Sequence, residues 1–229
     1  MKEETRERIN PKLKTYIDQQ VLPRYAGNIG GHGIDHIMQV IQRSFEIVDE
    51  FGLDVDPNKV YVIAAYHDIG YPINADEHEE VSAQMFLQEG ALQEFFDEEE
   101  RRLMAEAIVD HRASLEYEAR NIYGKIVSSA DREISVENML IRSLRFQRDK
   151  HWSEKPTLDQ IIEYSFQKLS SKYGKGGYAK MYFPDQKYQD YLAEMQALFT
   201  DKNHFIAREK EIAARIQLLE EKSKDGEER

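Results

Sequence analysis

The chain has 229 residues, a formal net charge of −12 and no cysteine. Hydrophobic residues make up 41% of it and charged residues 32%, which is typical of a globular protein and excludes a disordered chain. The absence of cysteine excludes disulfides, thiolate zinc sites and cysteine nucleophiles, so any metal ion is held by His, Asp or Glu. The negative charge disfavours a nucleic acid polymer as partner, because such binding needs many Lys and Arg against phosphates.

The length suits one domain over residues 1–229, and no break in composition argues for two. No apolar run approaches the roughly 20 residues that a membrane-spanning helix needs. The N-terminal segment MKEETRERIN lacks the apolar core of a secretory signal. We therefore expect a cytoplasmic protein with no membrane partner. Frequent Tyr and Phe after Tyr164 fit either a packed core or a homodimer interface.

Apolar residues spaced three and four apart predict helices along the whole chain, and no segment has the pattern of a strand. In chain order, helices are expected over residues 36–51, from 57 to the turn at 70, over 77–88, 98–112, 121–132, 136–150 and 157–173, from 184 onward, and over 205–222. The predicted fold class is therefore all-α, a single-domain helical bundle.

Capping residues support several of these helices. Asp35 stands where it can cap the helix at 36–51, and Asp56 followed by Pro57 is a typical helix start. Thr157 and Gln160 have the spacing of a capping box, and Gly174 provides the stop for that helix.

Five of the seven histidines lie in one region of the chain, together with two aspartates. Neutral imidazoles and ionised carboxylates together suit a borderline divalent cation, which accepts mixed nitrogen and oxygen ligands. This region therefore predicts a metal site. The candidate ligands are His36, His67, Asp68, His78, His111 and Asp131.

Three segments carry a resemblance to a known family. The stretches HGIDHIMQV, AAYHDIGYP and SSADRE resemble the motifs of the HD-domain superfamily of metal-dependent phosphohydrolases. The resemblance covers residues 30–135 as an HD-type metal-binding core and leaves 136–229 as a helical C-terminal extension of the same domain. It implies one ion held by His36, His67, Asp68 and Asp131. In one departure, Gln39 stands where the first motif often has arginine.

Two further segments bear on the number of ions. HEEVSA and AIVDHR resemble HD subfamilies with two extra histidines, among them the HD-type dinucleoside tetraphosphate hydrolases. This implies a second ion on His78 and His111, with Asp68 bridging. Alternatively, with one ion, the two histidines protonate the leaving oxygen or bind a phosphate. The ligand types suit Mn, Fe, Co, Ni or Zn better than Mg or Ca, so we expect one or two divalent transition-metal ions.

The expected function is a metal-dependent phosphohydrolase that cleaves a phosphate ester or phosphoanhydride of a small molecule, in the first place a nucleotide, by metal-activated water. The expected catalytic residues are Asp68, His78, His111 and Arg132. The expected substrate-binding residues are His32, Arg132, Lys175 and Lys180. The last two lie in the stretch SKYGKGGYAK, which is rich in Gly and Lys but lacks the spacing of a P-loop.

Two other classes of protein remain as alternatives. The same six candidate ligands resemble those of the HD-fold diiron oxygenases, which cleave C–C or C–P bonds with dioxygen. A non-catalytic module that senses a metal or ligand is the third reading. The retention of both His67 and Asp68 argues against it, because a module that only binds does not need the full set.

Overall fold

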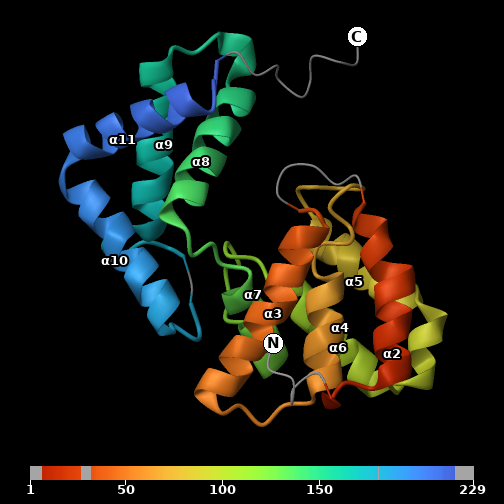
Figure 1. The fold of residues 1–229 in the computed structure, drawn as a ribbon. Coiled ribbons are helices and arrows are strands. Elements are labelled where there is room, and N and C mark those ends of the chain that lie inside the picture. The colour runs from red at the N-terminus through yellow and green to blue at the C-terminus, as the bar shows by residue number, and fades with distance from the viewer. Residues whose placement is uncertain (1–6, 27–31, 180, 220–229) are drawn as a thin grey trace. The chain divides into compact units, whose positions relative to one another are not determined.

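The computed structural model describes residues 7–26, 32–179 and 181–219. Every regular element in these ranges is helical, so the predicted all-α class is confirmed (Figure 1). No helix among them has the length and apolar character to span a membrane.

The described chain divides into two compact units. The first unit contains the described residues up to Arg132 and the short later segment 181–185. The second unit contains Glu133–Ala179 and the described residues from Gln186 onward. The single domain over 1–229 stays a prediction.

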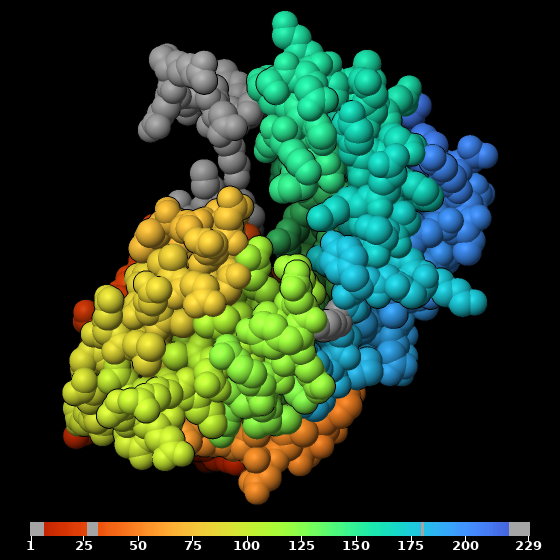
Figure 2. Space-filling view, turned by 180° about the vertical axis from the view of Figure 1, so that it is seen from behind, coloured from red at the N-terminus to blue at the C-terminus, as the bar shows by residue number. Residues whose placement is uncertain are grey.

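The first unit contains all six candidate ligands, which lie in its helices or in the residues that follow them. Its elements are α2 (Pro11–Tyr16), the π-helix η1 (Ile17–Val21), the 3₁₀ helices η2 (Leu22–Tyr25) and η3 (Gly90–Glu94), α3 (Ile34–Phe51), α4 (Pro57–Tyr66), α5 (His78–Gln88), α6 (Glu98–Val109) and α7 (Ile122–Ala130). In the space-filling view, the yellow to yellow-green segments that include α5 and α6 form much of the visible face of this unit (Figure 2).

Helix α4 is the centre of the first unit. Its residues from Val60 to Tyr66 are all buried, and it packs against α3, α6 and α7. A helix that is apolar on every side can only be stable when it is surrounded. Asp56 caps its first turn by accepting a hydrogen bond from Asn58 N at 2.8 Å, as predicted. His67 and Asp68 follow this buried helix directly and are therefore buried as well.

The second unit contains α8 (Val136–Lys150), the 3₁₀ helix η4 (Trp152–Glu154), α9 (Leu158–Tyr173), α10 (Gln186–Thr200) and α11 (Lys202–Arg215). The predicted capping box of Thr157 and Gln160 is present at the start of α9. Helix α10 begins two residues later than the predicted start at Pro184, and α11 begins at Lys202 instead of residue 205.

Several predicted helix ends were wrong near the candidate site. Helix α4 ends at Tyr66, α6 at Val109 and α7 at Ala130, so His67, Asp68, His111 and Asp131 lie at or just beyond helix ends. At the end of α6 the backbone of Asp110 departs from helical geometry, with ψ at 1°, and its carboxylate accepts hydrogen bonds from Arg120 N and Nε. The residue at the N-cap of α3 is Gly33, and Asp35 lies inside its first turn.

Candidate metal centre

All six candidate ligands converge in the first unit, from five helices or their ends. His36 lies in the first turn of α3, His78 is the first residue of α5, and His111 follows α6. His67 and Asp131 occupy the C-caps of α4 and α7. Their ligand atoms form groups within 4.8 Å of one another, namely His36, His67 and Asp131, and Asp68, His78 and His111.

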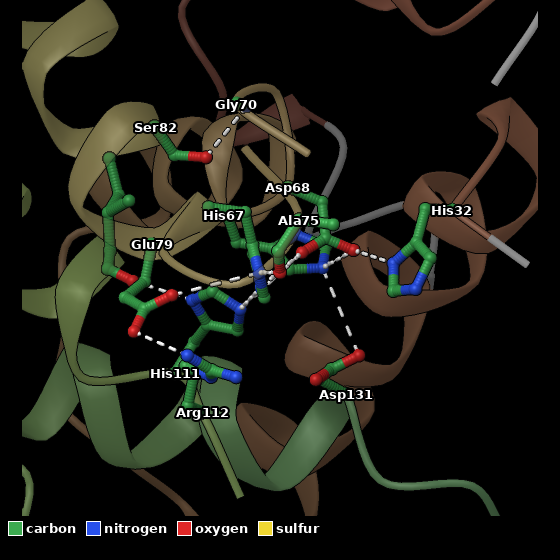
Figure 3. A network of polar contacts seen from close by, with 12 residues as sticks. His32, His67, Asp68, Gly70, Ala75, Glu79, Ser82, His111, Arg112 and Asp131 are labelled. Carbon is green, nitrogen blue, oxygen red and sulfur yellow. Dashed lines mark hydrogen bonds and ion pairs between the residues drawn. The ribbon is translucent and has the colours of Figure 1, made fainter. Parts of the chain in front are cut away.

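The Asp68 carboxylate lies between these groups (Figure 3). Its Oδ2 is 3.2 Å from His67 Nε2 and 3.4 Å from His36 Nε2. Its Oδ1 is 3.2 Å from His78 Nε2 and 3.5 Å from His111 Nε2. One carboxylate thus turns a different oxygen toward each pair of imidazoles, which is the arrangement that a bridging ligand requires.

Three of the histidines are oriented by the backbone. The Nδ1 atoms of His67, His78 and His111 lie 2.8, 3.0 and 2.6 Å from the carbonyl oxygens of the residues three positions earlier. A carbonyl oxygen only accepts, so each Nδ1 carries the proton and donates it. In the neutral ring, Nε2 is then left with a free lone pair that points into the cluster, as in metal-binding histidines with an oriented outer shell.

The atoms inside the cluster fit a cation. Among the described residues, His36 Nε2, His67 Nε2 and Asp68 Oδ1 are buried and have no hydrogen bond. The Nε2 atoms of His78 and His111 face each other at 3.2 Å, although Nδ1 of each ring already donates elsewhere. Two such lone pairs repel unless a proton or a metal ion lies beside them. The donor set of imidazole nitrogens and carboxylate oxygens therefore fits a divalent transition metal.

The charges around the cluster lead to the same conclusion. Burial lowers the pKa of His36, but the neighbouring carboxylates of Asp131 and Asp68 outweigh it and raise this pKa to about 9. Burial opposes ionisation of Asp131, but contact with His36 and the charge of His67 lower its pKa. Burial dominates at His111 and lowers its pKa. The two carboxylates therefore stay ionised and require positive charge next to them.

Three helix C-termini also face this region. His67, His111 and Asp131 lie at the ends of α4, α6 and α7, where the last carbonyl groups carry partial negative charge. A cation near the C-terminus of a helix is stabilised by about 0.3–1 kcal/mol when that terminus is exposed. The helix ends that departed from the prediction therefore contribute to the electrostatics of the site.

His32 and Tyr71 extend the cluster on one side. His32 Nδ1 lies 2.7 Å from Asp68 Oδ2, and its ring stacks on that of Tyr71 with centroids 3.8 Å apart. His32, predicted to bind substrate, thus contacts a candidate metal ligand directly, and its role in substrate binding stays a prediction. Tyr71 was missed by the sequence analysis, although it lies in the AAYHDIGYP motif.

Arg132 is buried beside the cluster. Its Nη2 donates to Ser128 Oγ at 2.7 Å, and its Nη1 lies 3.7 Å from Asp131 Oδ2. These contacts place the guanidinium against a candidate ligand, and its predicted role at a phosphate stays a prediction. Lys175 belongs to the second unit, in the turn after α9, and Lys180 lies outside the described residues.

Comparison with known proteins supports the reading of the cluster. The family model of the HD domain matches residues 33–134, a span that includes all six candidate ligands. Comparison with curated proteins and with solved structures found no match. HD domains are all-α and typically belong to metal-dependent phosphohydrolases, which agrees with the helices and the His/Asp groups observed. Residues 33–134 of this chain are therefore an HD domain.

Proposed function

We propose that this HD domain is a metal-dependent phosphohydrolase that cleaves a phosphate ester or phosphoanhydride of a small molecule, with nucleotides as the first class to test. The observation that carries the proposal is the orientation of three imidazoles by backbone carbonyls, with their Nε2 atoms facing Asp68. A set of core residues has no need for such lone pairs to converge on a buried carboxylate.

The proposed ligands fall into two sets that share Asp68. His36, His67 and Asp131 lie on its Oδ2 side, and His78 and His111 lie on its Oδ1 side. When bound there, divalent transition-metal ions supply a water of lowered pKa and withdraw charge from a phosphoryl oxygen. The two-sided environment of Asp68 supports two ions over one.

The remaining steps belong to side chains of this chain. Asp68 and Asp131 stay ionised because their pKa values are lowered, so they provide the negative charge that fixes cations in the site. The backbone carbonyls hold the protons on Nδ1 and keep Nε2 available. Arg132 contacts Asp131 and His111 O, so it steadies two proposed ligands in addition to its proposed approach to a phosphate. In the proposed mechanism no side chain attacks phosphorus.

His32 has a distinct proposed part. Its ring is partly exposed, whereas Asp68 beside it is buried. We assign it to the entrance of the site, where it orients Asp68 through Oδ2 and contacts the substrate. The other predicted properties, a small phosphorylated partner, a cytoplasmic location and a homodimer, stay predictions.

The test is hydrolysis of a panel of nucleotides, dinucleotides and non-nucleotide esters by protein loaded with Mn, Fe, Co, Ni or Zn, followed through both free phosphate and the nucleotide products. We expect hydrolysis of at least one substrate class that disappears on chelation and returns with metal. Metal-loaded protein that hydrolyses no substrate of any class would contradict the proposal. If the iron-loaded form instead consumed dioxygen with an organic substrate, the diiron oxygenase would be the correct reading.

A further inference from the structure

His78 is followed in the chain by the acidic residue Glu79, and His111 is followed by the basic residue Arg112. These two neighbours meet across the fold, with Arg112 Nη1 2.8 Å from Glu79 Oε1 (Figure 3). Both side chains are partly shielded from solvent, Glu79 more than Arg112. The ion pair therefore joins the start of α5 to the turn after α6, the two segments that present the histidines.

Arg112 makes a second contact on the same side. Its Nη1 donates to the backbone carbonyl of Asp76 at 2.6 Å. Asp76 follows Ala75, whose carbonyl accepts the Nδ1 proton of His78 at 3.0 Å. Arg112 thus holds both the turn that orients His78 and the residue that follows it.

The spacing of the two histidines needs such support. Their Nε2 atoms lie 3.2 Å apart with lone pairs facing each other, and this contact is repulsive when both rings are neutral. Without a proton or a cation beside them, the two neutral imidazoles do not attract each other at that distance. A contact outside the cluster that links their two segments can hold them there.

We propose that Glu79 and Arg112 are positioning residues that hold His78 and His111 at the spacing required for the second ion. The inference rests on the proposed function, because it takes these histidines and Asp68 as a metal-binding group. It goes further because it assigns part of the affinity for the second ion to the ion pair of Glu79 and Arg112, which does not itself bind a metal ion. The affinity for the first ion does not depend on this pair.

The test is a Mn²⁺ binding isotherm from equilibrium dialysis and elemental analysis, for wild type, Arg112→Gln, Glu79→Gln and the double variant. In each variant we expect the second binding step to weaken by about 10- to 100-fold, as for other outer-shell partners of metal ligands, and the first step to be unchanged. The double variant should bind no worse than Arg112→Gln, because the ion pair is already lost there, and Glu79→Gln should have the smaller effect, because it leaves the hydrogen bond from Arg112 to Asp76 O in place. Arg112→Lys, which keeps the charge, should recover part of the affinity.

Glu89→Gln is the matched control. It removes the ion pair of Arg24 and Glu89 at 2.9 Å, which is in the same unit and involves no candidate ligand. We expect it to leave both binding steps unchanged. The first step in each variant also reports that the site is folded.

The possible failures are distinguishable. An unchanged second step in Arg112→Gln, or an equal weakening of both steps, would overturn the positioning role while leaving the proposed hydrolase in place. A single binding step in wild type would overturn the role and reduce the proposed enzyme to one ion. If wild type bound no Mn²⁺, both the positioning role and the proposed metal-dependent hydrolase would be contradicted.

Discussion

The histidine side chains of the site are defined by which nitrogen carries the proton. At His67, His78 and His111 a backbone carbonyl accepts a hydrogen bond from Nδ1–H, so Nε2 faces the cluster before any ligand binds. His36 is different, because its pKa is raised to about 9 by Asp131 and Asp68 against the effect of burial. Near neutral pH His36 therefore holds a proton that a metal ion must displace.

This proton predicts how metal binding depends on pH. Below pH 9, binding of Mn²⁺ to His36 releases at least one proton, so the apparent association constant should rise by about tenfold or more for each pH unit between 6.5 and 8.5 or so. Calorimetry in buffers of different ionisation enthalpy counts the protons released. An affinity that is independent of pH over this range would show that His36 is not a ligand.

The candidate site was predictable in part from the sequence. The order of the His and Asp residues identified the six that converge, because four of them occur in three recognisable motifs and the other two in the segments HEEVSA and AIVDHR. The contacts that orient them were not predictable. The pairing of Glu79 with Arg112 joins residues 33 positions apart, and only the packing of α5 against α6 brings them together.

At the scale of the elements, two of the three helices with a predicted cap begin at that cap, whereas α3 begins at Ile34, before the predicted cap Asp35. Asp56 starts α4, and the box of Thr157 and Gln160 starts α9. The run from Pro11 to Tyr25 was missed, because a π-helical turn and Pro23 interrupt the regular spacing of its apolar residues. The C-terminal ends of α4, α6 and α7 were also predicted too late in the chain. The spacing of apolar residues continues past these ends, and the sequence pattern alone does not reveal the tertiary contacts of the residues that follow.

A close approach between elements gives a second prediction. Gly70 lies two residues after Asp68, and a Cβ there would come within 2.7 Å of Ser82 N and 2.8 Å of His78 O. Both are backbone atoms of α5, so the helix that carries His78 would have to move. Gly70→Ala should lower the free energy of unfolding by about 1–3 kcal/mol and weaken binding of the second Mn²⁺.

Gly90→Ala provides the comparison, because a Cβ at Gly90 meets no atom within 4 Å. Urea unfolding and Mn²⁺ isotherms of the two variants, measured in parallel, should differ clearly. If Gly70→Ala behaves like Gly90→Ala in both measurements, the close packing of α5 on the Asp68 turn is not what sets the site.

Three helices of the second unit meet around a buried acid. Ser165 Oγ of α9 donates to Glu209 Oε1 of α11 at 2.6 Å and lies 2.8 Å from Ser143 Oγ of α8. Burial raises the pKa of Glu209 from 4.5 to about 8, and the hydrogen bond from Ser165 only partly opposes this. The folded chain therefore keeps this carboxyl neutral at pH values where the unfolded chain ionises it.

Stability should consequently fall as pH rises from about 4.5 to about 8, because the folded state binds the additional proton in this window. The maximum slope for one proton is about 1.4 kcal/mol per pH unit. Glu209→Gln should flatten this dependence and be more stable than wild type at pH 8, as measured by urea unfolding. The same change at exposed Glu194 should do neither, and a parallel pH dependence in wild type and Glu209→Gln would refute the assignment.

At the scale of the whole molecule, the chain passes between its two units more than once. The segment that ends at Asp185 belongs to the first unit, whereas both flanking stretches belong to the second. In this segment the amides of Tyr182 and Phe183 donate to Ser129 Oγ at 3.2 and 3.3 Å, and Asp185 pairs with Arg43. Ser129 is two residues before Asp131, so the segment braces the helix that ends at a proposed ligand.

The HD domain occupies residues 33–134, and every proposed ligand lies within it. The central claim is that these residues form a metal centre around Asp68. Removing the Asp68 charge should therefore abolish binding of both ions, whereas removing the charge of exposed Asp35, next to His36 in α3, should not.

The most direct test is the metal-to-protein ratio, measured by elemental analysis after reconstitution with Mn²⁺ and removal of free ion. Wild type and Asp35→Asn should each retain about two ions per chain, and Asp68→Asn well below one, with circular dichroism showing that all three remain helical. Wild type that retains well below one ion, or Asp68→Asn that retains as much as wild type, would contradict the account.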